Sequence, residues 1–141
     1  MLMGEYNHSL DAKGRIIIPS KLREQLGERF VISKGLDPCL SAYPMEEWEK
    51  LVIKLQALPL TNKAARKFSR FILAGASEVE LDKQGRALLP QNLRDAAGLE
   101  KDLVLCGVGS RMEIWSKEAW ENESHYENIE ELADMMAELG I

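Results

Sequence analysis

The chain has 141 residues, 45% of them hydrophobic and 29% charged, which suits one compact domain or two very small ones. It contains no apolar run near the roughly 18 residues that a transmembrane helix needs, and its first residues lack the basic and apolar regions of a signal peptide. We therefore expect a cytoplasmic protein. The net charge of −5 is uneven, because residues 1–73 carry 12 basic and 8 acidic side chains whereas residues 74–141 carry 6 and 15. This asymmetry indicates a basic working face and an acidic tail held elsewhere.

The first half of the chain predicts a short mixed unit of strands and helices. The elements expected, in chain order, are a strand that ends at Leu10, a tight Asp-x-x-Gly turn, a strand 15–18, a helix 20–26, strands 30–33 and 40–43, and helices 45–57 and 62–74. Pro19 suits the start of the first helix, because the first helical turn tolerates a missing N–H, and Gly27 suits its end. Leu51, Leu55 and Leu58 recur at helical spacing and predict an apolar stripe.

The second half repeats this pattern. The segment from Gly4 to Arg15 aligns with the segment from Gly75 to Arg86 at an offset of 71, and after one inserted residue Trp48 aligns with Trp120 at an offset of 72. The corresponding elements are a strand that ends at Leu81, a second Asp-x-x-Gly turn, a strand 86–89, a helix 91–97, strands 103–106 and 113–115, and helices 117–123 and 128–139. Such self-similarity predicts two homologous units, residues 4–73 and 75–141.

Neither unit is large enough to fold alone. The strand-turn-strand-helix-strand part has roughly 45 residues and no disulfide, which is marginal for burying a core. We therefore predict an α+β fold in which the two units intertwine into one pseudo-two-fold barrel with flanking helices. Cys39 and Cys106 are expected to be small buried hydrophobic residues. On the acidic helix 128–139, an apolar face that includes Ile129 and Leu132 is expected to pack within the chain or against a neighbour.

One five-residue motif occurs once in each unit, as Asp11-Ala12-Lys13-Gly14-Arg15 and as Asp82-Lys83-Gln84-Gly85-Arg86. Its glycine supplies the positive φ that a hairpin loop needs, and its aspartate accepts turn N–H groups or orients the arginine. The arginine can bond a phosphate or the O6 and N7 atoms of guanine bidentately, while the lysine can contact backbone phosphates. The expected DNA contacts are Arg15, Lys13, Arg86 and Lys83, and the expected turn-forming residues are Asp11, Gly14, Asp82 and Gly85.

A purely structural interpretation of this motif is also open, because Asp-x-x-Gly-Arg is a generic hairpin turn with a local ion pair. The duplication lets both interpretations hold: aspartate and glycine build the turn, and arginine and lysine use it. The first loop has the more favourable surroundings, with Lys21 and Arg23 nearby and fewer acidic residues. We therefore expect Arg15 to be the stronger contact of the two arginines.

With both motifs in place, the chain resembles the MraZ family over nearly its whole length. The resemblance also includes the Tyr43-Pro44 and Trp48 segment, Ile114-Trp115, the central basic helix, and the segment 75–78. It implies the swapped-hairpin barrel of AbrB-type regulators, here formed by two repeats in one chain, and ring-like homo-oligomers. It further implies a nucleoid-associated transcriptional regulator of the bacterial division and cell-wall gene cluster. Such a regulator would bind short direct repeats of double-stranded DNA in its own promoter.

Other charged groups allow more than one interpretation. Lys63, Arg66, Lys67 and Arg70 form a basic helical face that would contact DNA or another subunit, or would simply be solvated opposite the aromatic residues of the same helix. Arg23 and Arg94 match between the repeats, and both could be salt-bridge partners on a helix surface.

The main competing function is a protein-interaction or assembly module that never touches DNA, which the acidic tail would support. Enzymatic activity is not expected, since the chain has only two histidines and no phosphate loop, metal-ligand cluster or nucleophile elbow. His8 and Asp11 make a poor triad with Ser9, because neighbouring strand residues point to opposite faces. We accordingly expect no metal and no cofactor.

Overall fold

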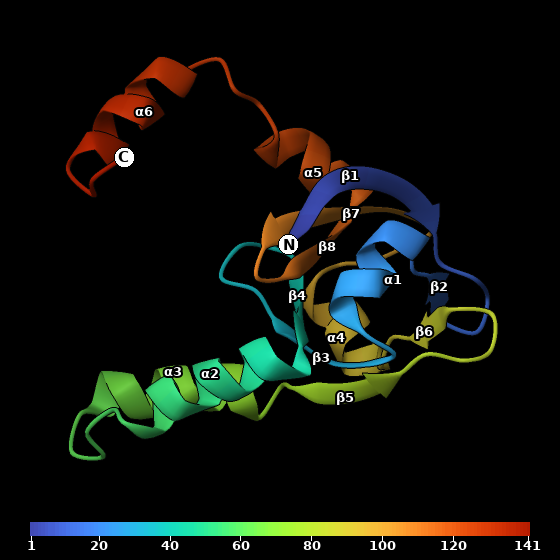
Figure 1. Cartoon of the computed structure of the whole chain (residues 1–141), viewed down its shortest axis with the longest axis horizontal. Helices are drawn as coiled ribbons and strands as arrows, with labels where there is room; N and C mark the ends of the chain where they lie inside the picture. Colours follow the sequence, from blue (N-terminus) through green and yellow to red (C-terminus); the bar gives the residue numbers. More distant parts are fainter.

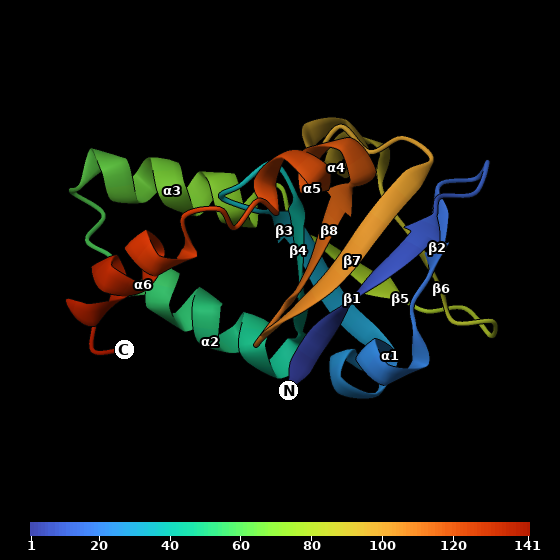
Figure 2. The ribbon, with the colours of Figure 1, turned by 90° about the horizontal axis from the view of Figure 1, so that it is seen from above.

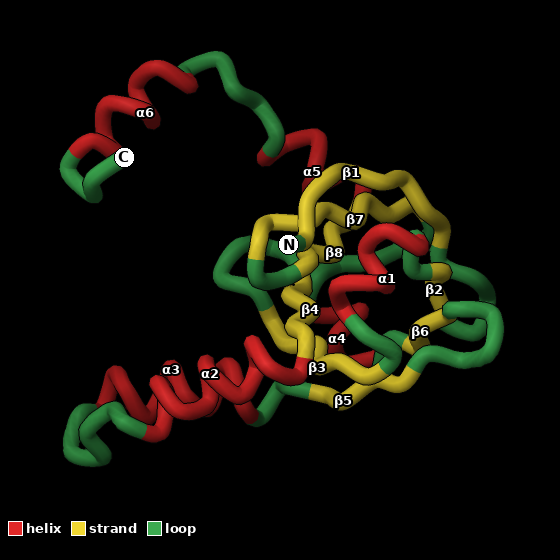
Figure 3. The backbone as a smooth tube through the Cα atoms, in the orientation of Figure 1, coloured by secondary structure: helices red, strands yellow, loops and turns green.

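The computed structural model describes the whole chain, residues 1–141. Its strands are β1 (Leu2–Ser9), β2 (Arg15–Ile17), β3 (Arg29–Lys34), β4 (Leu40–Pro44), β5 (Ser77–Glu80), β6 (Arg86–Leu88), β7 (Asp102–Gly109) and β8 (Met112–Ser116). Its helices are α1 (Ser20–Leu26), α2 (Met45–Gln56), α3 (Lys63–Leu73), α4 (Gln91–Ala96), α5 (Lys117–Glu123) and α6 (Ile129–Ala137). Every strand and helix expected from the sequence is present, and the fold is mixed α+β with antiparallel pairing (Figures 1 and 3).

The strands of one repeat pair mainly with strands of the other. Six strands form one sheet in the order β1-β7-β8-β4-β3-β5, and β2 and β6 form a separate two-stranded ribbon. Strand β1 lies along β7 from Leu2 opposite Gly109 to Ser9 opposite Asp102, and β5 lies along β3 in the same manner. At the centre of the ribbon, Ile16 of β2 lies opposite Ala87 of β6. Exchange of the two repeats maps these pairings onto one another, so the intertwining that was expected is present.

Two details of the expected architecture differ in the structure. The strands on either side of each Asp-x-x-Gly turn are not hydrogen-bonded neighbours, because β1 pairs with β7 while β2 pairs with β6. The turn itself is closed, but its two arms diverge into different sheets. The expected closed barrel is also not formed, because the six-stranded sheet runs from β1 to β5 without hydrogen bonds joining those two edges.

The core lies between the large sheet, the ribbon and helices α1 and α4. Nineteen buried residues from both repeats form one cluster, which includes Ile16, Ile18, Phe30 and Leu89. Fully burying a side chain of this size contributes about 1.5–3 kcal/mol, so the ribbon is anchored through its inner face.

Both cysteines are buried, as expected. Cys39 and Cys106 belong to a second, smaller cluster with Val104 and Trp115. Burial is the main reason that the pKa of each thiol is raised to about 12. The thiolate is the reactive form of cysteine, so these two residues serve packing.

The remaining helices project away from this body. Helices α2 and α3 form an antiparallel pair on one side, and α6 stands apart on the same side of the molecule (Figures 1 and 2). The two loops that carry the repeated motif lie at the opposite end, next to β2 and β6 (Figures 1 and 2). None of the helices combines the length and apolar character that crossing a bilayer would demand.

Candidate nucleic-acid interface

The first loop is a turn closed around a single carboxylate. The Asp11 N–H donates to the Arg15 carbonyl at 2.9 Å, and the Gly14 N–H donates to the Asp11 carbonyl at 3.0 Å. Asp11 Oδ1 accepts the backbone N–H groups of Lys13 and Arg15, each at 2.9 Å. Gly14 has φ +80°, which a residue with a Cβ adopts only at a cost. The aspartate and the glycine therefore build the turn.

The same carboxylate orients the arginine. Arg15 Nε donates to Asp11 Oδ2 at 2.8 Å, and neither Nη group of Arg15 takes part in a hydrogen bond within the chain. The guanidinium therefore keeps two parallel N–H donors for an external acceptor, which is the fork that suits a phosphate or the O6 and N7 edge of guanine. An arginine held in this way loses less side-chain entropy when it binds.

Hydrogen bonding also keeps Asp11 ionised. The backbone N–H of Arg15 has the largest effect and burial, which raises the pKa, the second largest; with the Arg15 side chain and the Lys13 N–H added, the hydrogen bonds prevail and hold the pKa of Asp11 below its ordinary value of 3.8. Because the carboxylate is negative and is hydrogen-bonded within its own loop, it would repel a phosphate brought to this surface.

The second loop has the same construction. Asp82 Oδ1 accepts the N–H groups of Gln84 and Arg86 at 2.9 Å each, and Asp82 Oδ2 accepts Arg86 Nε at 2.7 Å. Gly85 has φ +75°. Hydrogen bonds, led by that from the Arg86 backbone N–H, lower the pKa of Asp82 as they do that of Asp11. The two motifs are thus structurally equivalent, as their sequences predicted.

The lysines of the two loops are not equivalent. Lys13 occupies the third position of its motif, where its N–H is bonded to Asp11, whereas Lys83 occupies the second position of its motif. Lys83 lines a shallow hollow of about 250 Å³ together with Arg23 and the acidic Glu28. The second loop therefore has an acidic neighbour, which weakens its field for an anion.

The ribbon holds the two loops at a fixed separation. The Leu89 N–H donates to the Gly14 carbonyl at 2.9 Å, and the Ile18 N–H donates to the Gly85 carbonyl at 3.0 Å. Each loop is thereby bonded to the strand of the other repeat. Arg15 and Arg86 therefore belong to one hydrogen-bonded unit and can contact the same ligand.

The outer face of the ribbon adds apolar groups to these arginines. Because alternate strand residues point to opposite faces, Ile16 and Ala87 face the core and are fully buried. Arg15 lies opposite Leu88, and Ile17 lies opposite Arg86. Ile17 and Leu88 are 51% and 57% exposed. Neither residue was expected at the site, because each lies in an unbroken apolar run (16–18 and 87–89) in which no alternation marks the outward-facing position.

Arg23 and Arg94 have a different role from the one expected. Neither forms a salt bridge in the chain. Instead the Arg94 guanidinium lies over Gly14, so that a Cβ at Gly14 would come within 2.7 Å of Arg94 Cζ. The Arg23 guanidinium lies over Gly85 in the same way. Arg94 Nε also donates to the Leu89 carbonyl at 2.9 Å. Each arginine therefore supports the loop of the opposite repeat and adds positive charge beside it, so the expectation that Arg23 lies near the first loop was wrong.

The basic face of α3 does not join this site. Lys63, Arg66, Lys67 and Arg70 lie on the projecting pair of helices, at the opposite end of the molecule from the loops (Figure 1). Arg66 Nη1 donates to the Leu60 carbonyl at 2.8 Å, at the tip of that pair. The structure thus separates two basic surfaces, one on the ribbon and one on α3.

Comparison with known proteins agrees with the doubled architecture. The family described as "MraZ protein, putative antitoxin-like" matches the chain twice, over residues 1–71 and 72–138. Proteins named "Transcriptional regulator MraZ" are 59% identical in Acetivibrio thermocellus and 60% identical in Clostridium beijerinckii, in each case over 143 aligned positions that cover all of both chains. The protein of that name in Natranaerobius thermophilus is 58% identical over 95% of this chain and 98% of its own.

The doubled family match and the names of these relatives place the chain among transcriptional regulators, and not among enzymes. The chain belongs to the MraZ family. A solution structure from Pyrococcus horikoshii aligns with 81% of this chain and 88% of its own, with 15% identity and a TM-score of 0.33. That likeness is too distant to support a conclusion about the fold.

Proposed function

We propose that this regulator binds double-stranded DNA sequence-specifically through the β2–β6 ribbon and its two Asp-x-x-x-Arg loops. The observation that carries the proposal is the pair of arginines, Arg15 and Arg86, each held by its aspartate through Nε with both Nη groups free, on the exposed face of one rigid ribbon. Such an arrangement presents two preformed forks to one ligand. The two arginines do not contribute to the core, since they lie on the face of the ribbon that points away from it.

The chemistry of the ribbon suits a DNA groove. The major groove admits a two-stranded β-ribbon, and ribbon readers of this kind are known among DNA-binding proteins. In this arrangement Arg15 and Arg86 bond guanine edges or phosphates, Lys13 and Lys83 bond backbone phosphates, and Ile17 and Leu88 contact thymine methyl groups. The acidic half of the chain does not oppose binding, because the local field at the loops decides it.

The two units, residues 4–73 and 75–141, are proposed to be repeats of the AbrB-type swapped-hairpin kind. The exchange of strands between the repeats supports this, because β1 pairs with β7 and β5 pairs with β3. The regulator is further proposed to act in the cytoplasm on the nucleoid, without a cofactor.

Its target is proposed to be a set of short direct repeats in its own promoter, within the bacterial division and cell-wall gene cluster. One ribbon supplies modest specificity, because a good bidentate contact discriminates by about 1–3 kcal/mol. A ring-like homo-oligomer removes this limit, since several ribbons on one particle meet several repeats on one DNA. Avidity of about 10²–10⁴ then arises without new contacts, provided that the geometry allows simultaneous engagement.

A gel-shift titration on the protein's own upstream region tests the proposal. Arg15→Ala and Arg86→Ala should each weaken binding to a single repeat by about 5-fold to 150-fold, with the larger loss for Arg15→Ala because Glu28 lies beside the second loop. Lys117→Ala is the matched control, since this exposed residue lies on α5 and away from the ribbon. Unchanged binding of both arginine variants, with assembly intact, would overturn the site assignment.

Salt dependence separates this function from the alternative of an assembly module that never touches DNA. Binding through several phosphate contacts must weaken steeply as salt rises. Lys13→Ala should flatten the slope of log affinity against log salt by about one. A wild-type protein that shows no salt-dependent DNA binding would favour the assembly module.

A further inference from the structure

The two Asp-x-x-x-Arg loops differ in the side chains at their tips. In each loop the glycine N–H donates to the aspartate carbonyl at 3.0 Å, so the second and third residues of the motif are the central residues of a tight turn. These residues are Ala12 and Lys13 in the first loop, and Lys83 and Gln84 in the second, and all of them are exposed. Each tip therefore has one lysine, but only the second tip has an amide.

The third position of the motif has the same backbone geometry in both loops. The Lys13 N–H donates to Asp11 Oδ1 at 2.9 Å, and the Gln84 N–H donates to Asp82 Oδ1 at 2.9 Å. The two side chains therefore start from equivalent places beside the ribbon. The amide of the Gln84 side chain forms no hydrogen bond within the chain, so its oxygen and its NH2 group are both available to a ligand.

The rest of the exposed ribbon is nearly the same in the two repeats. Arg15 and Arg86 are held alike, and the exposed aliphatic residues Ile17 and Leu88 occupy equivalent positions. A reader with two equal halves would bind an asymmetric DNA site equally well in either direction, because a half-turn of the protein returns the same contacts. The third position of the loops is where the pseudo-symmetry is broken by a group that can read a base.

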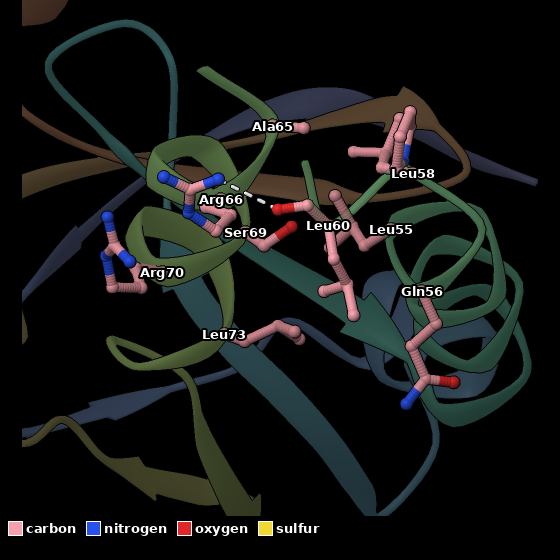
Figure 4. Close-up of a pocket in the computed structure, with 10 residues that line it drawn as sticks. Leu55, Gln56, Leu58, Leu60, Ala65, Arg66, Ser69, Arg70 and Leu73 are labelled. Atoms are coloured by element: carbon pink, nitrogen blue, oxygen red, sulfur yellow. Dashed lines mark hydrogen bonds between the residues drawn. The ribbon is translucent and has the colours of Figure 1, made fainter. Parts of the chain in front are cut away.

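The groove between α2 and α3 does not contribute to this difference. It has a volume of about 460 Å³, with Leu55 and Leu58 on one side and Leu73 on the other (Figure 4). The two helices project at the end opposite the loops (Figures 1 and 2). The groove therefore does not face a duplex that lies on the ribbon.

We propose that the side chain of Gln84 reads an adenine in the DNA major groove, in the part of the site that the second loop contacts. Adenine presents there the N7 acceptor and the N6 amino donor, and a glutamine amide has one donor group and one acceptor that pair with both. Guanine presents two acceptors, and cytosine and thymine each present one polar group, so these bases match the amide less well. Lys13 has donors only, which suit a phosphate or a guanine. This inference rests on the proposed binding of DNA by the ribbon.

Reading of adenine by one loop fixes the direction in which a chain lies on its DNA site. The loop with Gln84 lies at the end of the repeat that has the adenine, and the loop with Lys13 lies at the other end. Contacts to phosphates cannot set this direction, since they carry no sequence information. Direct repeats of the kind proposed above suit such a reader, because all copies then face the same way along the DNA.

Replacement of the adenines of a single DNA repeat by 7-deazaadenine, one position at a time on each strand, tests the contact by fluorescence anisotropy. Wild type should lose about 2-fold to 12-fold in affinity at one adenine, because one of the two hydrogen bonds of a bidentate contact is removed. Gln84→Met keeps the length of the side chain without the amide and should be indifferent at that position. It should bind the unmodified repeat about 5-fold or more weakly than wild type, with an unchanged salt slope, because glutamine is uncharged.

The direction of binding is measured by hydroxyl-radical cleavage from an iron–EDTA group attached to Ala12→Cys, at the tip of the first loop. The two native cysteines are buried and escape the label. With Gln84 present the cuts should fall at one end of a single repeat, whereas with Gln84→Met both ends should be cut. Cuts confined to one end in both proteins would overturn the role of Gln84 in setting the direction.

The matched control is Lys13→Met, at the same position of the first loop. It should flatten the salt slope by about one and keep the wild-type sensitivity to the same 7-deazaadenine. Equal losses for wild type and Gln84→Met at every adenine, or no loss at any adenine, would overturn the reading of adenine. Weakened binding by Arg15→Ala and Arg86→Ala would then still support the ribbon as the DNA-binding surface, whereas unchanged binding by both would remove the proposed function itself.

Discussion

Replacement of Asp11 by asparagine distinguishes orientation of Arg15 from simple electrostatics. Removing a negative charge beside a DNA-binding arginine should strengthen binding if charge alone mattered. The structure predicts the opposite, because the carboxylate uses both oxygens: Oδ1 accepts two backbone N–H groups and Oδ2 accepts Arg15 Nε. Asparagine has a single acceptor oxygen and cannot satisfy both sets.

The magnitude follows from comparing the two effects. Freeing the Arg15 side chain returns part of the roughly 1.5–2 kcal/mol of rotamer entropy that binding must then remove again. The repulsion relieved between an exposed carboxylate and a phosphate is mostly screened once they are about 8 Å apart at physiological salt. Loss of orientation should therefore prevail, and Asp11→Asn should bind a single DNA repeat between about threefold and tenfold more weakly.

Fluorescence anisotropy with a labelled single repeat measures this change. Glu24→Gln is the matched control, since it removes one exposed negative charge on helix α1 of the first repeat and Glu24 has no hydrogen-bond partner to lose. It should bind as tightly as wild type or slightly more tightly. Tighter binding by Asp11→Asn would refute the orienting role of the aspartate.

Three further outcomes follow from the same geometry. The folded state lowers the pKa of Asp82 below 3.8, so the contribution of the Asp82 carboxylate to stability is complete above that pH and is lost as pH falls through the lower folded-state pKa. The difference in melting temperature between wild type and Asp82→Asn should therefore persist from neutral pH to about 5 and vanish in stronger acid. Gly85→Ala should lower the free energy of unfolding in urea by about 1–2 kcal/mol, because φ is +75° and the new Cβ would displace Arg23. Ile17→Ser with Leu88→Ser should leave that free energy within about 0.5 kcal/mol, since both are exposed, yet weaken DNA binding without changing its salt slope.

The local structure of the site could be predicted from the sequence. Asp11, Gly14 and Arg15 form the expected turn and ion pair because these depend on residues within five positions of one another. The helix starts at Ser20 and Gln91 were also predictable, since a proline precedes each. Turns, local ion pairs and helix starts can be predicted because the residues that determine them are close in the sequence.

The choice of strand partners could not be predicted in the same way. Strand β1 pairs with β7, about a hundred residues away, and such pairing is decided by which arrangement buries the shared core rather than by the turn that follows β1. The packing of Arg23 on Gly85 and of Arg94 on Gly14 is a consequence of that exchange. A match between repeats identified Arg23 and Arg94 as notable, but only the fold shows that each supports the other repeat's loop.

The most direct test of base reading by Arg15 replaces guanine with 7-deazaguanine in a single DNA repeat, one position at a time. This change removes the N7 acceptor and keeps the base pair. At the contacted guanine, wild type should lose about 2-fold to 12-fold in affinity, because the change removes one of the two hydrogen bonds of a bidentate contact worth about 1–3 kcal/mol, whereas Arg15→Ala should be indifferent to the same change. Equal losses for wild type and Arg15→Ala at every position would contradict the proposal that the first loop reads DNA.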